Sequence, residues 1–246
     1  MNSISPNLNI MVKACEKASK VLIRDFGEIE NLQVLSKGPR DFVTNSDKKV
    51  EKILIDELLK FKKNFSVLSE ESGYIENSDK NNIWIIDPID GTTNFLHGVP
   101  HFSISVALKS NNEISSGLIF DPIKNEIFYA EKNSGAHFNN HRVRVSKKNT
   151  LDECLFATNL NGAKKTDLNT RITGCASLDL AYTGSGRFDG FFQNSIHLWD
   201  IAAGIIIVEE AGGKVNDINK YKSDSINIRA SSNNIYNKML EKLTNF

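Results

Sequence analysis

The chain has 246 residues, 40% of them hydrophobic and 24% charged, a composition that fits a folded globular protein and argues against disorder. Thirty basic residues balance thirty acidic ones, so no overall field favours nucleic acid or a membrane surface as a direct partner. Three widely spaced cysteines, a charged N-terminus with Lys13, Glu16 and Lys17, and no apolar run near the roughly 20 residues of a membrane helix predict a cytoplasmic protein.

The chain is expected to open with two amphipathic helices. Apolar residues recur at helical spacing over residues 8–26 and stop at a glycine, which marks the end of the first helix. A linking stretch around residues 38–39 follows. Ser46 or Asp47 then suits the N-cap of a second helix, whose apolar face runs over residues 50–61.

A series of short strands is predicted next. Residues 83–86 form a wholly apolar strand, which Asp87 and Pro88 are expected to end because proline cannot donate to a sheet ladder. Turn-like pairs at residues 111–112 and 124–125 suggest that the sheet is an antiparallel meander. Its other strands are predicted at residues 65–68, 103–108, 114–120, 126–130, 135–138 and 142–145.

The second half of the chain alternates strands and helices. Strands are predicted at residues 155–158, 188–193, 214–216 and 227–231, and helices at residues 177–185, 200–211 and 235–243. The fold class is therefore expected to be α+β. Residues 1–148 and 149–246 are predicted to be two halves of one compact structural unit.

The segment from Asp87 to Thr92 carries the most informative chemistry. Asp87 stands at the end of a buried strand and Asp90 lies one turn further on, so the two carboxylates can converge. Gly91 allows a close approach of the backbone, and Thr92 would begin a helix whose N–H groups suit a phosphate. Paired carboxylates would repel such an anion unless a cation lay between them, and oxygen-only ligands favour Mg²⁺.

Three further acidic residues can reach the same place. Glu70 follows the strand predicted at residues 65–68, Asp47 lies at the start of the second helix, and Asp200 lies in the first turn of an apolar helix. Each of these positions also has a simpler interpretation as a helix cap or a solvated turn, and Asp87 with Pro88 could be an ordinary turn. The convergence of four such positions favours the metal site.

These residues show a resemblance to the inositol monophosphatase family of lithium-sensitive, magnesium-dependent phosphatases, and most closely to its bacterial members. The resemblance covers nearly the whole chain, and the run Asp-Pro-Ile-Asp-Gly-Thr-Thr-Asn-Phe at residues 87–95 is highly specific. The matching stretches are residues 41–47, 70–72, 84–95, 174–192 and 197–213.

The resemblance implies a layered α-β-α-β-α sandwich of the inositol monophosphatase and fructose-1,6-bisphosphatase type, often a homodimer. It also implies two or three Mg²⁺ ions per site. Glu70, Asp87 and the backbone carbonyl of Ile89 would hold the first ion. Asp87, Asp90 and Asp200 would hold the second, and a third, weaker ion would lie near Glu70.

The resemblance also implies roles in substrate binding and water activation. Thr92, with Asp47 behind it, would orient the attacking water, and Glu70 would act with them in catalysis. Gly91 and Thr92 would cradle the phosphate. The full set of implied substrate contacts is Asp90, Gly91, Thr92, Ala176, Gln193 and Asp200.

Two departures from the family leave the substrate open. Gln193 stands where animal members carry a glutamate that grips the inositol hydroxyls, and residues 159–171 leave little room for the helix and strand that relatives insert there. The substrate is expected to be a small phosphate ester, with inositol monophosphate first. Alternatives are 3′-phosphoadenosine 5′-phosphate, fructose 1,6-bisphosphate and histidinol phosphate. An alternative of another class is an accessory factor in RNA-processing or transcription complexes, as some bacterial relatives are.

Overall fold

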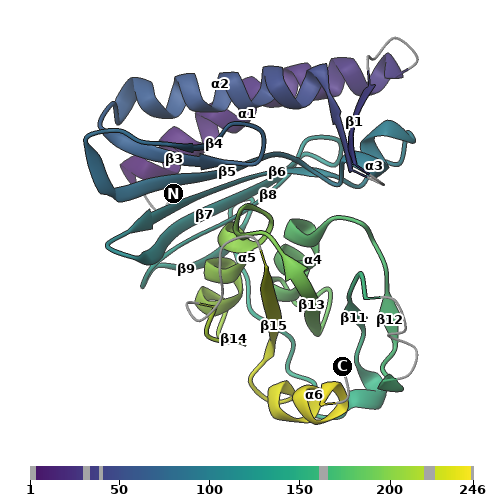
Figure 1. The fold of residues 1–246 in the computed structure, drawn as a ribbon. Coiled ribbons are helices and arrows are strands. Elements are labelled where there is room, and N and C mark those ends of the chain that lie inside the picture. Colours follow the sequence, from purple (N-terminus) through teal and green to yellow (C-terminus); the bar gives the residue numbers. More distant parts are fainter. Residues whose placement is uncertain (1–3, 30–33, 39–40, 161–165, 219–224, 245–246) are drawn as a thin grey trace.

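Helices and sheets alternate in five layers in the computed structural model (Figure 1). Helices α1 (Pro6–Gly27) and α2 (Asn45–Phe61) cover one face of an eight-stranded sheet. Helices α4 (Ala176–Gly184) and α5 (Leu198–Glu210) lie between this sheet and a five-stranded one, whose far face is covered by α6 (Tyr236–Leu243). The structure describes residues 4–29, 34–38, 41–160, 166–218 and 225–244. The expected α+β class and the α-β-α-β-α sandwich are confirmed.

The eight-stranded sheet is mostly an antiparallel meander, as predicted. Its strand order is β10-β9-β8-β7-β6-β5-β3-β4, and only the β3–β5 pair is parallel. Asn111 and Asn112 both have positive φ, as a tight hairpin turn requires. The strands are β3 (Phe65–Ser69), β4 (Gly73–Ile75), β5 (Asp79–Asp90), β6 (Ser103–Ser110), β7 (Glu113–Asp121), β8 (Glu126–Glu131), β9 (Gly135–Phe138) and β10 (His141–Arg142).

The five-stranded sheet combines parallel and antiparallel pairs. Its order is β12-β11-β13-β15-β14, in which β11 is parallel to both neighbours and β15 is antiparallel to both. The strands are β11 (Phe156–Ala157), β12 (Thr170–Arg171), β13 (Gly190–Ile196), β14 (Gly213–Val215) and β15 (Ile226–Ser232).

Strand β5 is buried on both faces from Trp84 onwards, which explains the apolar run at residues 83–86. Trp84 and Ile86 join the core under α1 and α2, whereas Ile85 faces the core under α4 and α5. A Cβ atom on Gly117 of β7 would lie 2.7 Å from the Cα atom of Ala203. The missing side chain at Gly117 therefore lets α5 lie directly on the sheet, with its first turn near the end of β5.

The prediction that Asp87 and Pro88 end the strand was wrong. Strand β5 continues through Pro88 to Asp90. The pairing with β6 shifts between Asp87 and Asp90, so Pro88 lies in an irregular stretch where the ladder needs no N–H group.

Three smaller predictions also need correction. Ser46 and Asp47 do not precede the second helix but lie in its first turn, with their side chains buried. The strand expected at residues 142–145 shortens to β10, because the Val145 N–H turns away to donate to the Ala211 carbonyl at 3.2 Å. The linking stretch contains a hairpin of β1 (Val34–Gly38) and β2 (Asp41–Thr44).

Strands β4 and β12 were also not predicted, since runs of two or three residues leave no periodic pattern. Residues 161–165, within the short segment at 159–171, lie outside the described residues. In the part of the chain that the structure describes, no helix is both long and apolar enough to cross a membrane.

Candidate metal centre

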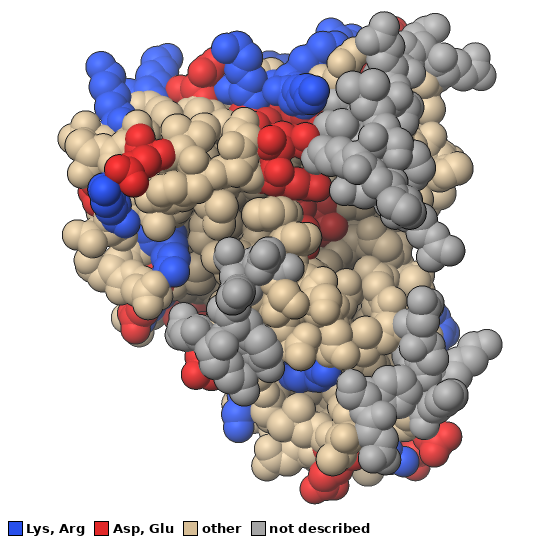
Figure 2. Space-filling model, viewed as in Figure 1, with Lys and Arg blue, Asp and Glu red and all other residues tan. Residues whose placement is uncertain are grey.

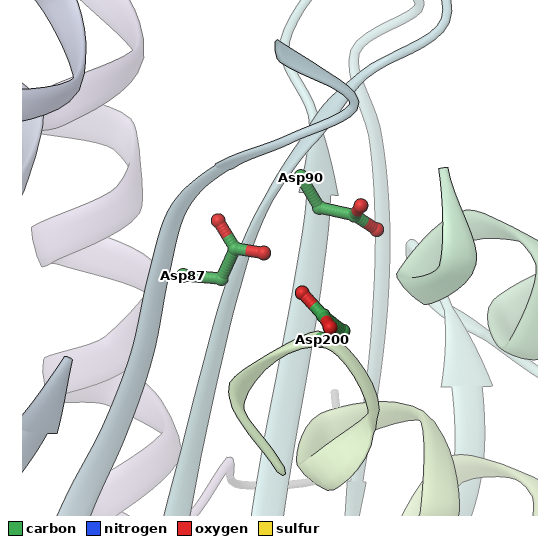
Figure 3. A group of neighbouring side chains, drawn as sticks. All are labelled: Asp87, Asp90 and Asp200. Carbon is green, nitrogen blue, oxygen red and sulfur yellow. The ribbon is translucent and has the colours of Figure 1, made fainter. Parts of the chain in front are cut away.

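Three aspartates from two elements meet at one point (Figure 3). Asp87 and Asp90 come from the end of β5, and Asp200 comes from the first turn of α5. Each offers one carboxylate oxygen, and these oxygens all lie within 4.8 Å of one another. The predicted convergence of these three side chains is therefore found.

The irregular end of β5 brings its two aspartates to the same side. Asp87 pairs with Ser105 and Asp90 with Ser103, so two residues of β5, Pro88 and Ile89, lie opposite the single residue Ile104 of β6. The Asp87 carboxylate folds back and accepts a hydrogen bond from the Ile89 N–H at 3.0 Å. In a regular strand, residues three apart would point to opposite faces, so the irregularity is what allows both carboxylates to converge.

Asp200 is fixed by the start of α5. Its Oδ2 accepts a hydrogen bond from the N–H of the N-cap residue His197 at 3.0 Å. The rings of His197 and Trp199 stack in nearly parallel planes with centroids 4.5 Å apart. The carboxylate thus serves as a helix cap and still faces Asp87 and Asp90, so the predicted cap is observed and its role as a metal ligand stays a prediction.

The electrostatics of the cluster favour a bound cation. Burial, followed by the negative charges of Glu70, Asp90 and Asp200, raises the pKa of Asp87 well above its usual range. Burial and the charges of Asp90 and Glu70 likewise raise the pKa of Asp200. Carboxylates held this close are costly as anions unless a positive charge lies between them. An all-oxygen donor set of this kind fits a hard divalent ion such as Mg²⁺.

Glu70 belongs to the same cluster. It follows β3, and its side chain hydrogen-bonds to the Asp87 carboxylate, a contact that raises the pKa of Asp87. Figure 2 shows acidic side chains running from the α2 side into the hollow above the C-terminal half, next to a row of lysine and arginine side chains. The position predicted for Glu70 beside Asp87 is thus the one observed.

Glu51, for which the sequence predicted no role, anchors the turn that contains Glu70. Glu51 lies in α2 and is only 4% exposed. Its carboxylate accepts hydrogen bonds from the hydroxyl groups of Ser69 and Ser72, and from the N–H of Glu71 at 3.0 Å. A glutamate on the buried face of an amphipathic helix, four residues after Asp47, was the signal available in the sequence.

The glycine and threonine after Asp90 begin the short helix α3 (Thr92–Leu96). Gly91 is its N-cap with φ +91°, and an added Cβ there would lie 3.1 Å from the His101 carbonyl oxygen. The close approach expected at Gly91 is therefore observed between backbone segments. The Thr92 hydroxyl donates a hydrogen bond to the Ile89 carbonyl at 2.9 Å.

The other residues implied by the resemblance lie on three different elements. Ala176 is the first residue of α4, and its N–H is close enough to the Asp90 carboxylate to help lower the pKa of that group, which burial raises. Gln193 lies in β13 and is half-buried, and its side-chain oxygen has no hydrogen-bond partner among the residues that the structure describes. Asp47 is buried in the first turn of α2. Their roles toward a substrate stay predictions.

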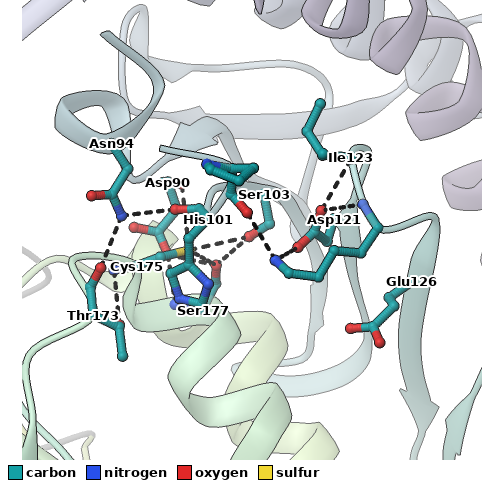
Figure 4. A network of polar contacts seen from close by, with 12 residues as sticks. Asp90, Asn94, His101, Ser103, Asp121, Ile123, Glu126, Thr173, Cys175 and Ser177 are labelled. Atoms are coloured by element: carbon teal, nitrogen blue, oxygen red, sulfur yellow. Dashed lines mark hydrogen bonds and ion pairs between the residues drawn. The ribbon is translucent and has the colours of Figure 1, made fainter. Parts of the chain in front are cut away.

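A network of small polar groups, also missed by the sequence analysis, surrounds Asp90 (Figure 4). Hydrogen bonds from Ser177 and Cys175 lower the pKa of Asp90 and partly offset the increase caused by burial. The Asn94 side chain bridges two segments by donating to the carbonyl groups of His101 and Thr173, both at 2.8 Å. Asp90 is therefore surrounded by hydrogen-bonded polar groups that connect β5, β6 and α4.

Comparison with known proteins assigns this architecture to a family. The model of the inositol monophosphatase family matches residues 4–245. The chain belongs to the inositol monophosphatase family. It is thus a phosphoric monoester hydrolase by family, and the family's dependence on metal agrees with the acidic cluster.

Individual relatives are similar along almost the whole chain. An inositol-1-monophosphatase of Rhizobium meliloti is 44% identical over 225 residues, 85% of each chain. One of Caulobacter vibrioides is 40% identical and covers 95% of this chain and 99% of its own. The Nus factor SuhB of Haemophilus influenzae is 37% identical over 98% of this chain and 96% of its own.

Solved structures agree with the fold. The extragenic suppressor protein suhB of Bartonella henselae superposes with a TM-score of 0.91 at 43% identity, covering 97% of this chain and 98% of that one. The inositol monophosphatase of Thermotoga maritima gives 0.89 at 37% identity, with 98% of both chains covered.

Proposed function

We propose that this protein is a Mg²⁺-dependent phosphomonoesterase that hydrolyses a small polyol or sugar phosphate, with inositol monophosphate as the first candidate. The observation that carries the proposal is the convergence of Asp87, Asp90 and Asp200, with Glu70 beside them, in a member of a family of phosphoric monoester hydrolases. The names of the Rhizobium meliloti and Caulobacter vibrioides relatives support inositol monophosphate.

The carboxylates would hold two or three Mg²⁺ ions. Glu70, Asp87 and the Ile89 carbonyl form one ligand set, and Asp87, Asp90 and Asp200 form the second, with a weaker third position near Glu70. When bound, the ions supply Lewis-acid activation of water and neutralise charge on the phosphate and the leaving alkoxide. The proposed shared ligand Asp87 is buried, and its pKa is raised by burial and by the charges of Glu70, Asp90 and Asp200, so its negative charge is unfavourable in the absence of the ions.

Thr92 is placed to orient the attacking water. Its hydroxyl hydrogen is directed to the Ile89 carbonyl, so its oxygen lone pairs remain to accept a hydrogen bond from water. Asp47, buried in α2, would support Thr92 from behind. Gly91 and Thr92 would seat the phosphate with N–H groups at the start of α3.

The organic part of the substrate would lie against Ala176 and Gln193, together with Asp90 and Asp200. The Gln193 amide both donates and accepts hydrogen bonds, which suits a hydroxyl-rich substrate. Because an amide replaces a carboxylate here, 3′-phosphoadenosine 5′-phosphate, fructose 1,6-bisphosphate and histidinol phosphate are the alternatives. A homodimer and inhibition by lithium are further predictions from the family resemblance, to be checked by light scattering and by assays with lithium.

The test is phosphate release from a panel of inositol, sugar, nucleotide and histidinol phosphates, with Mg²⁺ and with excess chelator. We expect one preferred substrate, full dependence on Mg²⁺, and loss of turnover in Asp90→Asn. Full activity in chelator would refute the metal mechanism. A wild-type rate in Asp90→Asn would place the reaction elsewhere.

A second candidate function is an accessory role in transcription or RNA-processing complexes. It is favoured by the relatives named Nus factor SuhB, which are 37–38% identical to this chain. Balanced charge argues for a protein partner over direct RNA contact. Replacing the chromosomal copy with Asp87→Asn separates the two functions: a cellular role that survives loss of turnover would be non-enzymatic.

A further inference from the structure

The Asp90 carboxylate is enclosed by small polar side chains from two other elements (Figure 4). Its Oδ2 atom accepts hydrogen bonds from the Ser177 N–H at 2.6 Å and from the Ser177 hydroxyl, and lies 3.2 Å from Cys175 Sγ. The Oγ atoms of Ser103 and Ser177 are 2.7 Å apart. Ser103, Cys175 and Ser177 are fully buried, so water does not compete for these hydrogen bonds.

We propose that Ser177 is a positioning residue of the metal centre. Its N–H and hydroxyl groups fix the rotation of the Asp90 carboxylate and hold Oδ2, so that Oδ1 is presented to the metal. The inference rests on the metal-binding role of Asp90 under the proposed function. No part of Ser177 needs to contact the metal or the substrate.

The directions of the hydrogen bonds follow from the chemistry of the groups. An ionised Asp90 only accepts, so the Ser177 hydroxyl must donate its one hydrogen to Oδ2. Ser177 Oγ can then only accept from Ser103, which donates. Ser103 lies opposite Asp90 in the pairing of β5 with β6. This register places the Ser103 hydroxyl beside the Ser177 hydroxyl.

The start of α4 explains why two donors from one residue reach the same oxygen. Ser177 is the second residue of this nine-residue helix, where N–H groups have no partner within the helix. Rotating the Asp90 carboxylate away would leave the buried N–H and hydroxyl of Ser177 unsatisfied, which is costly. The carboxylate is therefore held in one orientation before any ligand arrives.

The experiment is a calorimetric titration of Mg²⁺ into the full-length protein without substrate, combined with the Mg²⁺ dependence of phosphate release from inositol 1-phosphate. We expect Ser177→Ala to raise the Mg²⁺ dissociation constant by about 10-fold. This factor is at the lower end for residues that hydrogen-bond to a metal ligand, because the Ser177 N–H still donates to Asp90 in the variant. At saturating Mg²⁺, kcat should change by less than about 2-fold.

Three further variants allow the inference to be tested even if Ser177→Ala does not fold. Ser177→Cys has nearly the same shape with a weaker donor, so its dissociation constant should lie between those of wild type and Ser177→Ala. Ser103→Ala should shift it in the same direction by a smaller factor. The matched control is Ser185→Ala at the other end of α4, whose hydroxyl bonds to the Tyr182 carbonyl at 3.3 Å, and it should bind Mg²⁺ like wild type.

Unchanged Mg²⁺ affinity in folded Ser177→Ala or Ser177→Cys would overturn the inference. Mg²⁺ binding by wild type without phosphate release from any ester of the substrate panel would refute the phosphatase proposal, yet the calorimetric comparison would still decide the role of Ser177. Absence of Mg²⁺ binding by wild type would overturn both.

Discussion

The two sides of the carboxylate cluster are stabilised in different ways. On the α4 side, Asp90 receives hydrogen bonds from Ser177 and Cys175, which lower its pKa against the effect of burial. On the side of β3 and β5, burial and the charges of Glu70, Asp90 and Asp200 all raise the pKa of Asp87. Hydrogen bonds from the protein therefore offset part of the cost of burying the Asp90 carboxylate, whereas the acidic neighbours of Asp87 add to the cost of burying its carboxylate.

This difference separates two kinds of substitution. A neutral side chain at Asp87 removes the carboxylate shared by both proposed ions, and it also removes a charge that is repelled by Glu70, Asp90 and Asp200. Substitutions of residues that hydrogen-bond to the proposed metal ligands or hold them in place, without contacting the metal, should change the Mg²⁺ affinity by smaller factors.

Asp87→Asn should give the largest effect. The asparagine keeps a carbonyl oxygen for the Ile89 N–H, so the local backbone should persist. Loss of a shared metal ligand should lower kcat/KM for inositol 1-phosphate on the order of 10³-fold or more, since metal stabilisation of the transition state is worth several kcal/mol. Steady-state phosphate release at saturating Mg²⁺ measures it.

The same variant should be more stable than wild type when Mg²⁺ is absent. Removing one charge from a buried like-charged cluster should raise the free energy of unfolding by about 1–2 kcal/mol, or about 2–8 °C in Tm for a chain of this size. Thermal unfolding in chelator measures the change. A Tm below that of wild type would contradict the picture of Asp87 as the repulsive centre.

Glu51→Ala should give the second-largest loss of activity. Without the carboxylate that accepts from Ser69, Ser72 and Glu71, the turn that carries Glu70 loses its attachment to α2. We expect kcat/KM to fall about 10-fold, as for other groups behind metal ligands. Glu51→Gln keeps one acceptor for the Glu71 N–H and should lose less. Equal losses in both variants would point to the charge of Glu51 instead of its geometry.

The carboxylates proposed as metal ligands were predictable because local sequence specifies them. Asp87 and Asp90 lie three residues apart at the end of an apolar strand, and Glu70 and Asp200 also stand at element ends. Even so, the strand was expected to stop at Asp87. The pairing shift that carries β5 on to Asp90 depends on β6, which no local pattern of β5 reveals.

The residues that hold the proposed metal ligands in place by hydrogen bonds were not predictable from sequence. Ser177 lies 87 positions from Asp90, and Ser103 lies 74 positions from Ser177. Their contacts exist only because α4 packs with its N-terminus against the end of β5. A serine in a sequence carries no signal of such a contact, whereas an aspartate before a proline does.

Gly117→Ala should test how the packing of α5 sets the position of Asp200. An added Cβ would lie 2.7 Å from the Cα atom and 2.8 Å from the carbonyl oxygen of Ala203, so the helix backbone must move. Overpacking of this kind costs about 1–3 kcal/mol, and denaturant unfolding should show a loss in that range. A smaller loss of activity should accompany it because α5 carries Asp200. Gly27→Ala, where a Cβ would meet nothing within 4 Å, is the matched control.

The smallest expected effect is the stabilisation of the wild-type protein by Mg²⁺. At ten times its dissociation constant, an ion that binds only the folded state adds about 1.4 kcal/mol, which is about 3–6 °C in Tm. Asp87→Asn should lose this increase, whereas Ser177→Ala should regain it at about ten times more Mg²⁺. Thermal unfolding over a Mg²⁺ series measures all three proteins. The same Mg²⁺-dependent increase in Asp87→Asn as in wild type would mean that the ion binds away from the β3 and β5 side, and the contrast between the two sides would no longer hold.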